Sequence, residues 1–291
     1  MKNTWRFIQS GYADAYTNMA FDEALLRQFS AGRCSPTLRV YGWDPAAFSV
    51  GLAQEPGEVL RLEECRQNDI PVVRRMTGGG AIFHCRELTY SLVCGKDDLG
   101  ACGTVAASFR RICAFLIRAY RDLGLQAEFS IESAAGKALP CRFNAPFCFA
   151  GKEKYDILIE GKKLGGNAQK RSRGIIFQHG SIPLQSDVQA AISFLREEPR
   201  GLSDEVCALD EVLRGKIEFN DLAGILRKAF QRTFPVGLTD CVFTQEERSL
   251  ADELRREKYA ASSWNNFREV TLPVNEKECN DASLLEKTAL A

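Results

Sequence analysis

The chain has 291 residues, of which 45% are hydrophobic and 26% charged, a composition typical of a globular protein with a substantial core. Its 38 basic and 38 acidic side chains balance, so no overall field attracts nucleic acid or an anionic membrane. The sequence contains neither a signal peptide nor an apolar run of about 18 residues that could span a bilayer. These features predict a cytoplasmic protein whose partners are neither nucleic acid nor membrane.

Strands and helices are predicted to alternate through the first half of the chain. Segments rich in β-branched and aromatic residues predict strands at residues 4–9, 37–43, 47–52, 81–84 and 88–93. Apolar residues at helical spacing predict helices at residues 17–29, 57–70 and 104–124. The last of these helices is expected to supply core packing and no chemistry.

The second half begins with short extended runs and ends in helices. From Cys148 to Leu184, turn sequences separate the extended runs, which predicts a meander of antiparallel strands. Beyond it, helices are predicted at residues 187–198, 219–234 and 248–260, and Thr244 with Glu247 predicts a capping box. The polar residues from about Thr271 onward are expected to be weakly ordered.

The stretch "RRMTGGGAIFH", from Arg74 to His84, places three glycines between two arginines and a histidine. Glycine suits positions where the backbone closely approaches a ligand or takes a positive φ. A phosphate-binding loop would end in Lys-Ser/Thr and enter a helix, whereas this stretch enters a strand, so the phosphate interpretation is weak. Spacing alone leaves a binding wall and a plain strand connection open.

A second glycine segment, "EGKKLGGNAQKR", places Lys162 and Lys163 before Gly165 and Gly166. Small residues after a lysine let a substrate lie against the strand backbone. Residues 151–173 carry seven basic and three acidic side chains, a local net charge of +4. Two interpretations stay open, a solvated edge strand kept soluble by lysine and a dock for an acidic partner.

The 11 cysteines include no CxxC pair and no regular spacing, so neither a disulfide framework nor a zinc site is predicted. Most are expected to be reduced core residues. Cys148 differs because it precedes the basic segment, where a nearby cation would favour the thiolate. His84 and His179, the two histidines, lie beside the glycine segments, and a core or hydrogen-bonding role is the default interpretation for both.

Taken in order, six segments resemble the biotin/lipoate protein ligase superfamily, most closely its lipoate-protein ligase and octanoyltransferase branch. The match runs over roughly residues 3–265, and the segments that carry it are "TNMAFDEALL", "RRMTGGGAIFH", "ELTYS", "KKLGGNAQ", "FQHGSI" and "LRREKYAASSWN". The resemblance implies a mixed α/β (α+β) fold of the class II biotin/lipoyl synthetase type, with a largely antiparallel sheet flanked by helices. It also implies a catalytic domain at residues 1–265 that ends in helices, followed by a polar tail at residues 266–291.

Within this branch, "ELTYS" and "CFAGKEKYD" resemble the octanoyltransferases that work through a cysteine fifteen residues before a lysine, the spacing of Cys148 and Lys163. The resemblance implies that Cys148 accepts octanoyl from octanoyl-acyl carrier protein as a thioester. Lys163 would lower the pKa of the thiol, steady the oxyanion and help to deprotonate the incoming amine. The acceptor would be a lysine of a lipoyl-domain protein, such as glycine cleavage H protein or a 2-oxoacid dehydrogenase E2. Neither a metal nor a cofactor is implied, since converting a thioester to an amide is downhill.

The same resemblance makes the two glycine segments walls of an apolar acyl pocket. The implied substrate-binding residues are Arg74, Gly78, Gly79, Gly80, His84, Gly165, Gly166, Asn167, Ala168 and His179. Three alternatives stay open, namely ATP-dependent ligation of free lipoate or octanoate, amidotransfer between lipoyl domains, and acyl binding without catalysis. The third glycine, Gly80, is the ligase-like detail, because cysteine octanoyltransferases often have arginine there.

Overall fold

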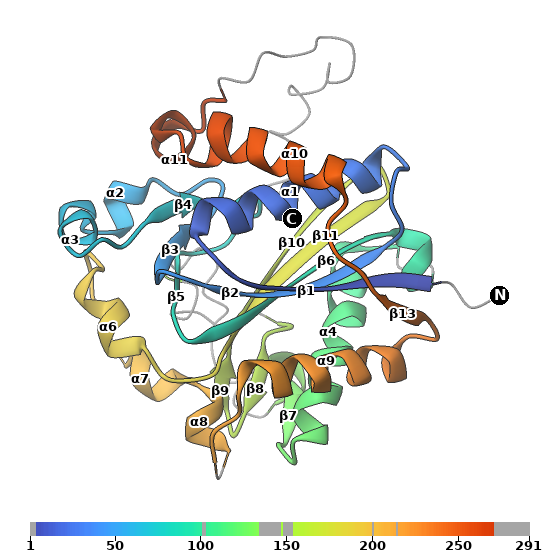
Figure 1. The fold of residues 1–291 in the computed structure, drawn as a ribbon. Coiled ribbons are helices and arrows are strands. Elements are labelled where there is room, and N and C mark those ends of the chain that lie inside the picture. The colour runs from blue at the N-terminus through green and yellow to red at the C-terminus, as the bar shows by residue number, and fades with distance from the viewer. Residues whose placement is uncertain are drawn as a thin grey trace.

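The computed structural model describes residues 4–100, 103–133, 147, 154–199, 201–213 and 215–270, arranged around a six-stranded sheet (Figure 1). The strands, in the order β10-β11-β6-β2-β1-β13, are β1 (Thr4–Ala13), β2 (Thr37–Trp43), β6 (Glu87–Gly95), β10 (Gly166–Ser172), β11 (Ile175–Pro183) and β13 (Gly237–Asp240). β10, β11, β6 and β2 pair antiparallel, whereas β1 pairs parallel with β2 and β13. This mixed, largely antiparallel sheet with flanking helices confirms the predicted fold class.

The two faces of the central sheet differ, because side chains alternate along each strand. On β6, Leu88, Tyr90 and Leu92 belong to a large apolar cluster that includes α4 (Val105–Asp122) and α9 (Phe219–Thr233). Thr89 and Ser91 occupy the alternate positions and are buried on the other side. The sequence pattern of β6 therefore directs apolar residues to α4 and α9 and polar residues to the opposite face.

That opposite face is covered by α1 (Ala15–Ser30) and α10 (Gln245–Leu254), which lie side by side (Figure 1). Asp14 caps α1 by accepting hydrogen bonds from two backbone N–H groups of its first turn. α10 begins with the predicted capping box, in which the side chains of Thr244 and Glu247 each accept from the other's backbone N–H. Each cap contributes about 1 kcal/mol and fixes where its helix begins.

Two smaller sheets and several short helices flank this core. One sheet has the order β4-β3-β5, from β3 (Ala47–Val50), β4 (Val72–Arg74) and β5 (Ile82–His84). The other has the order β12-β9-β8-β7, from β7 (Ala127–Phe129), β8 (Ile157–Ile159), β9 (Lys162–Leu164) and β12 (Val206–Cys207). The short helices are α2 (Pro56–Val59), α3 (Leu62–Gln67), α6 (Val188–Ser193), α7 (Leu202–Glu205), α8 (Leu209–Val212) and α11 (Ser262–Phe267). Single helical turns at Lys96–Leu99 and Ser130–Glu132 and a π-helical turn at Arg255–Tyr259 complete the secondary structure.

Three predictions about the elements need correction, and several short strands were not predicted. The helix predicted at residues 57–70 is divided into α2 and α3, because Leu60 is extended and forms a β-bridge with Leu195. The helix predicted at residues 187–198 is only α6. The predicted meander is split between two sheets, since β8 and β9 lie in the small one and β10 and β11 in the central one. The short strands β7, β12 and β13 were not predicted, because they are specified by their partners.

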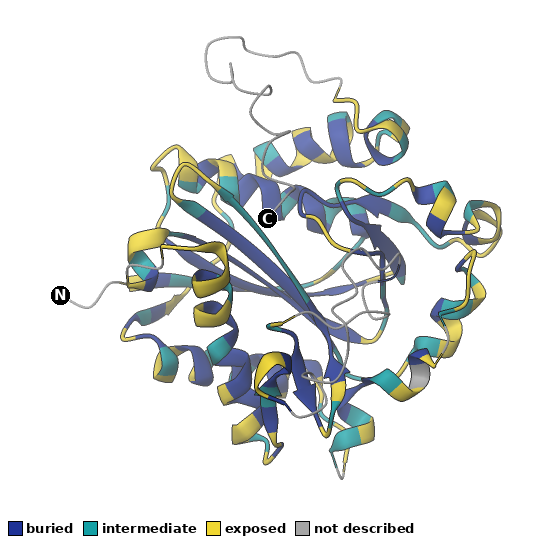
Figure 2. Ribbon diagram, turned by 180° about the vertical axis from the view of Figure 1, so that it is seen from behind, coloured by how far each residue is buried: buried dark blue, intermediate teal, exposed yellow. Residues whose placement is uncertain are grey.

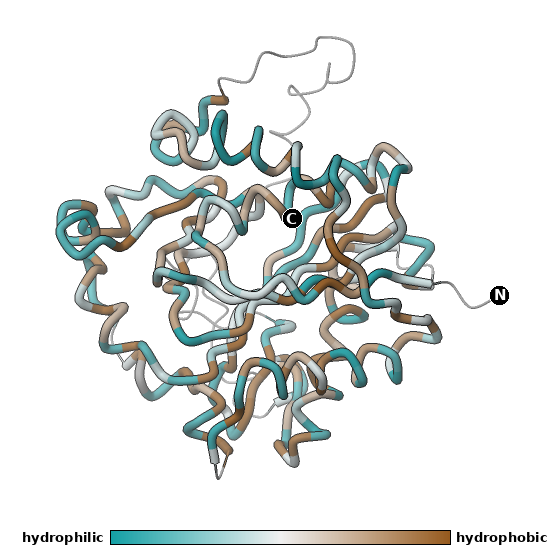
Figure 3. Tube along the Cα trace, in the orientation of Figure 1, coloured by the Kyte–Doolittle hydropathy of each residue, from teal (hydrophilic) through white to brown (hydrophobic). Residues whose placement is uncertain are grey.

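Burial follows the layers of the fold. Buried residues line the central strands and the inner sides of the flanking helices, whereas exposed residues lie on outer helix surfaces and turns (Figure 2). Hydrophilic residues gather on the peripheral helices, among them α10 (Figure 3). Within the described ranges, no helix is both long and apolar enough to cross a membrane. The polar tail predicted at residues 266–291 lies mostly outside the described residues, which end at Val270.

Candidate active site

The glycine stretch between β4 and β5 is organised by Arg75, which is buried. The guanidinium of Arg75 donates to the carbonyl oxygens of Gly78 and Gly80, at 2.7 and 2.8 Å. Its other end donates to the carbonyl and the hydroxyl of Ser49 on β3. Gly79 has a φ of +94°, in the region that favours glycine. The stretch is therefore a tight turn folded around one arginine side chain.

Arg74 points to a different part of the molecule. Its guanidinium donates to the carbonyl oxygens of Leu52 and Gln54 and to that of Asn265 in α11. Its backbone N–H donates to the Asn265 side chain and its carbonyl accepts from the Trp264 indole, so α11 is fastened to β4. Of the two adjacent arginines, Arg75 lines the neighbouring cavity. Arg74, the arginine predicted as a binding residue, is not among the residues that line it.

The cavity beside Arg75, called here the first cavity, has a volume of about 280 Å³ and opens to solvent. Met19, Trp43, Ile82 and Ala168 give it apolar walls, and Gly166 and Gly180 bring the backbone of β10 and β11 to its surface. Among the predicted binding residues, His84, Gly166, Ala168 and His179 line it directly. The structure thus joins the two glycine segments, which are far apart in sequence, around one space.

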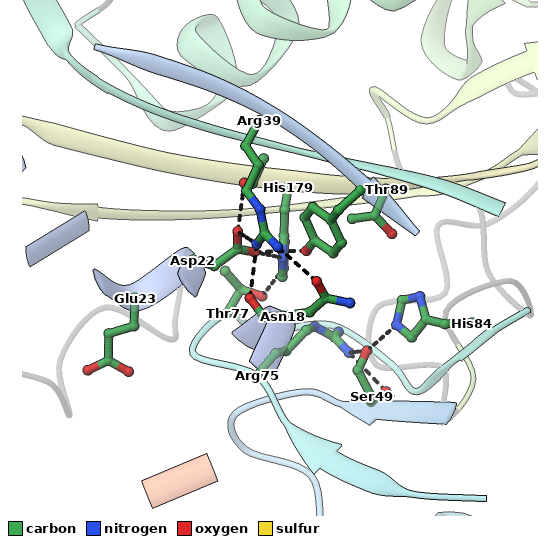
Figure 4. A network of polar contacts seen from close by, with 12 residues as sticks. Asn18, Asp22, Glu23, Arg39, Ser49, Arg75, Thr77, His84, Thr89 and His179 are labelled. Atoms are coloured by element: carbon green, nitrogen blue, oxygen red, sulfur yellow. Dashed lines mark hydrogen bonds and ion pairs between the residues drawn. The ribbon is translucent and has the colours of Figure 1, made fainter. Parts of the chain in front are cut away.

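A buried polar network under α1 supports one side of the first cavity (Figure 4). Asp22 accepts from Arg39 at 2.8 Å and from the hydroxyls of Tyr41 and Ser91. Nδ1 of His179 lies 3.6 Å from the Asp22 carboxylate. Burial raises the pKa of Asp22, but His179 and Arg39 outweigh it and hold that pKa below the ordinary value. Asp22 is therefore an anion that fixes the β2, β6 and β11 side chains at the cavity.

His179 is held between Asp22 and Thr77. Its Nε2 lies 2.7 Å from the Thr77 hydroxyl, which comes from the glycine stretch. Burial lowers the pKa of His179 below its ordinary value, although Asp22 acts in the opposite direction. A neutral ring that turns Nδ1–H toward Asp22 leaves Nε2 to accept from Thr77. His179 thereby ties the glycine stretch to the central sheet.

His84 belongs to a second series of hydrogen-bonded side chains, on the other side of the first cavity. Its Nδ1 lies 3.0 Å from Oε1 of Glu87. Its Nε2 lies 2.7 Å from the hydroxyl of Ser49 (Figure 4). Glu87 also accepts from the hydroxyls of Thr89 and Ser181. An ionised carboxylate only accepts, so opposite such a group Nδ1 of His84 is the donor, and a neutral ring then leaves Nε2 to accept from Ser49. The ring also stacks on the Trp43 indole, with centroids 3.8 Å apart.

Lys163 lies on β9, three residues before the Gly166 wall. Its side chain is buried, and its Nζ is 2.8 Å from Oδ2 of Asp156, which is also buried. Lys162, its neighbour, is exposed. The solvated-edge interpretation of the basic segment is therefore wrong for Lys163, whereas Lys170 and Arg171 do lie on β10, the edge strand of the central sheet.

Gly165 connects the Lys163 strand to the cavity wall. Its φ is +76°, and a Cβ added there would lie 2.1 Å from the carbonyl oxygen of Ser181. Asn167, on the following strand, accepts from the Tyr90 hydroxyl at 2.7 Å. Gly165 and Asn167 therefore do not line the first cavity but help to position the strands that do. Gly78, Gly79 and Gly80 act in the same indirect way, through the turn around Arg75.

Cys148 lies outside the described residues, but the residue before it is placed. Phe147 is buried and forms a parallel β-bridge with Ala81, at the end of the glycine stretch. Its ring belongs to an apolar cluster with Phe48, Val50 and Val206. The chain therefore runs next to the glycine stretch one residue ahead of Cys148.

Several residues of the site were missed in the sequence, namely Asp22, Ser49, Arg75, Glu87, Asp156 and Ser181. A usable signal existed for two of them, since Glu87 follows His84 by three residues and Asp22 sits among apolar helix positions. Asp156 had been counted only as one acidic side chain in a basic segment. In the part of the chain that the structure describes, no group of three or more His, Cys, Asp and Glu side chains could hold a metal ion.

Comparison with known proteins places these features in a family. A family model described as the lipoyl protein ligase A/B catalytic domain matches residues 14–231. The chain is 37% identical over 272 residues to octanoyltransferase LipM of Kyrpidia tusciae, covering 90% of this chain and 98% of that protein. It is 33% identical over 273 residues to octanoyltransferase LipM of Geobacillus kaustophilus, with 91% and 98% covered. The crystal structure of a lipoate-protein ligase A bound with ATP is similar at a TM-score of 0.74 and 25% identity, over 91% of this chain and 98% of that one.

Proposed function

Since the chain belongs to the lipoyl protein ligase A/B catalytic-domain family, and within it to the octanoyltransferase LipM family, we propose that it transfers octanoyl through a thioester on Cys148. It is an acyltransferase of lipoate biosynthesis, with an acyl donor and a lipoyl-domain acceptor. The observation that carries the proposal is the buried Lys163–Asp156 pair, a fixed cation on the strand that leads, through Gly165, to Gly166 in the wall of the first cavity. One catalytic domain at residues 1–265 with a polar tail at 266–291 belongs to the same proposal.

In the first step, the Cys148 thiolate attacks the thioester carbonyl of octanoyl-acyl carrier protein and displaces the carrier thiol. A free thiol, with a pKa of about 8.5, is only a few per cent ionised at neutral pH, so a nearby cation increases the reactive fraction. In this proposal the ammonium of Lys163 supplies that charge, and Asp156, 2.8 Å from it, stabilises its charged form. As a hydrogen-bond donor, Lys163 also suits a developing oxyanion.

The octanoyl chain would occupy the first cavity. At about 0.8 kcal/mol for each buried CH₂, a chain of this length gains several kcal/mol from walls such as Met19 and Ile82. Gly166 and Ala168 suit this role, because small side chains leave room for a ligand against the strand. Gly78, Gly79 and Gly80 would hold the wall through Arg75, and Arg74 and Asn167 would act as structural supports.

The second step passes octanoyl to a lysine amine of a lipoyl domain, such as that of glycine cleavage H protein or a 2-oxoacid dehydrogenase E2. Lys170 and Arg171 on the β10 edge strand offer positive charge to acidic carrier and lipoyl domains. A thiol nucleophile requires a reducing compartment, which supports a cytoplasmic location. No ATP or other cofactor enters the scheme, because the thioester already carries the activation.

Mass spectrometry of the intact protein tests this scheme. After incubation with octanoyl-acyl carrier protein, the parent protein should gain one octanoyl group that hydroxylamine removes. The Cys148→Ser variant should gain no octanoyl group. The matched control is Cys34→Ser, at a half-buried cysteine that is far from Cys148 in the sequence, and it should gain the octanoyl group as the parent does. Absence of the adduct in the parent, or normal transfer by Cys148→Ser, would overturn the proposal.

The same assay separates the alternative activities. ATP-dependent ligation of free octanoate or lipoate would require ATP and would survive loss of Cys148. The structural likeness to a lipoate-protein ligase A bound with ATP makes this the main competitor. Amidotransfer would show labelling from an octanoylated lipoyl domain and not from the carrier protein. A binding protein without catalysis would retain octanoyl-acyl carrier protein and form no adduct.

A further inference from the structure

A second cavity, of about 440 Å³, adjoins the first one. Ser181 lines both cavities, and Glu87, which lines the second, hydrogen-bonds to His84 and Thr89 in the wall of the first. The second cavity is bounded on one side by Val206 and Cys207, whose strand β12 pairs with Lys163 and Leu164 of β9. The two spaces therefore meet near the Lys163 strand.

The walls of the second cavity are mainly apolar and contain two carboxylate side chains. Phe83, Phe147, Ala191 and Val206 supply apolar surface. The two ionisable carboxylates in the lining are Glu87 and Asp187, and no lysine, arginine or histidine stands among its described lining residues. Asp187 is already bonded to Arg86 at the exposed rim, so its charge is largely compensated. Glu87 is the buried acid of this cavity.

Glu87 retains capacity to accept one more hydrogen bond. Oε1 accepts from His84 and Thr89, and Oε2 accepts from Ser181. Each carboxylate oxygen has two lone pairs, so Oε2 can accept one further donor. Among the described residues, the ionisable groups around Glu87 are His84 from β5, Tyr41 from β2, the Arg86 and Asp187 pair at the rim, and the thiols of Cys85 and Cys207 in the walls.

We propose that the second cavity is the entry channel for the acceptor lysine, and that Glu87 binds its amine and accepts a proton from it. The inference rests on the proposed function, because it assigns a site to the second half of that reaction. Four methylenes of a lysine match the apolar walls, and the ammonium matches the buried carboxylate. A phosphopantetheine arm is less well matched, since its phosphate is an anion and the channel is acidic.

The proton balance explains why a second base is needed. An attacking lysine begins as an ammonium and ends as an amide N–H, so it loses two protons. One passes to Glu87 and on to solvent, which frees the lone pair that attacks the thioester carbonyl. The C–N bond forms, the C–S bond breaks, and the second proton leaves with the Cys148 sulfur as a thiol. The proposal gives this role to Glu87 in place of Lys163, which the family resemblance implied, because an ammonium paired with Asp156 has no lone pair for either proton.

The test follows discharge of the acyl-enzyme by two amines. Protein acylated with octanoyl-acyl carrier protein is mixed with n-butylamine, which has the stem and charge of a lysine, or with hydroxylamine, which is neutral near pH 7. Glu87→Gln should slow discharge to n-butylamine at least about tenfold near pH 7, a typical size for loss of a general base. The deficit should shrink as the pH approaches about 10.4, the usual pKa of a lysine-type amine, because about half of the amine is then already neutral.

In the same variant, discharge to hydroxylamine should stay within about twofold of the parent, since that nucleophile needs no deprotonation. The exposed Glu63→Gln serves as the matched control and should behave like the parent throughout. Equal losses with both amines would show that Glu87 only supports the fold, and unchanged discharge to n-butylamine would show that it takes no part. Either result would overturn the assignment.

A wall variant distinguishes the acceptor lysine from the donor arm. Val188, half-buried at the start of α6, lines the second cavity, and Val188→Phe narrows it. Slower discharge to n-butylamine with normal acylation by octanoyl-acyl carrier protein supports a lysine channel. Slower acylation with normal discharge would assign the cavity to the carrier arm instead. If the parent protein never forms an acyl-enzyme, the proposed function itself fails, and this outcome is separate from all the others.

Discussion

The ammonium of Lys163 lies 2.8 Å from a carboxylate oxygen of Asp156, and both side chains are buried. A buried charge is costly without its partner, so the two residues depend on each other for folding. The lysine was found from its distance to Cys148 in the sequence, whereas its partner became visible only in the fold.

Replacing Asp156 by Asn should therefore destabilise the protein and slow acylation. We expect the free energy of unfolding to fall by about 3 kcal/mol, the size typical of removing one partner from a buried ion pair. Urea titration measures the loss, and the mass assay measures octanoyl adduct formation. Asp122→Asn is the control, because Asp122 pairs with surface arginines and should cost less than about 1 kcal/mol. Equal costs in the two variants would contradict a buried pair.

Gly165→Ala should be far more disruptive than a glycine substitution with the same backbone strain. Gly165 and Gly174 have φ values of +76° and +81°. A Cβ at Gly165 would lie 2.1 Å from the Ser181 carbonyl oxygen, whereas one at Gly174 would meet its nearest atom at 3.9 Å. We expect about 1 kcal/mol of destabilisation at Gly174 from the left-handed backbone alone and at least about twice that at Gly165. Thermal unfolding of the two variants makes the comparison.

The same substitution should impair catalysis, because Gly165 joins the Lys163 strand to the cavity wall. Acylation by Gly165→Ala is expected to drop even at temperatures where the variant is folded. Near-normal acylation by folded Gly165→Ala would mean that the position of β9 relative to β10 matters little.

Enlarging Ala168 should shorten the acyl chain that the enzyme accepts. The side chain of Ala168 lines the first cavity from an edge strand, so Ala168→Leu fills ligand space while leaving the main core intact. We expect octanoyl transfer to fall roughly tenfold or more, since a few methylenes are worth about 1–3 kcal/mol each in such a pocket. Transfer of a butyryl group should be affected much less.

Ser172→Leu is the control for this experiment, because Ser172 is exposed on the same strand four residues away. Acyl-carrier proteins loaded with the two chains provide the measurement. Equal losses for octanoyl and butyryl would place the acyl chain somewhere else.

Acid should weaken the attachment of the C-terminal helices through Glu23. Burial raises the pKa of Glu23, but the charges of Lys258 and Arg27 and two hydrogen bonds outweigh it and lower that pKa to about 2, from 4.5. A pKa that is lower in the folded state contributes stability above the unfolded value and loses it as the pH falls toward the folded value. Below about pH 4.5, this group should therefore cost up to about 1.4 kcal/mol per pH unit.

Urea titrations between pH 5 and pH 3 measure this effect. Glu23→Gln should be less stable than the parent near neutral pH, because Lys258 is left buried without its carboxylate. Its stability should also fall less steeply in acid, since the titrating group has been removed. Parallel pH profiles for the two proteins would show that Glu23 is not the group responsible.

The order of elements and the family could be read from local patterns. Alternation along β6, the helical spacing of α4 and the capping box at Thr244 each depend on neighbouring residues, so the sequence contains them directly. The spacing of Cys148 and Lys163, which the family resemblance implies as the catalytic pair, can also be read from the sequence alone. The division of the helix at residues 57–70 was not readable, since Leu60 is extended by pairing with Leu195, far along the chain.

Which charged side chains are buried, and which residues they pair with, depends on the tertiary structure. Arg74 and Arg75 are adjacent and chemically identical, yet Arg74 ends β4 and reaches a carbonyl of α11, whereas Arg75 begins the turn that follows and lines the first cavity. Lys162 and Lys163 divide in the same way between solvent and Asp156, since successive side chains on a strand face opposite sides. A sequence fixes which charges a protein possesses, but their energies depend on the distance to a partner and on exclusion of water. Both are properties of the folded chain, which is why Asp22, Glu87 and Asp156 emerged only from the structure.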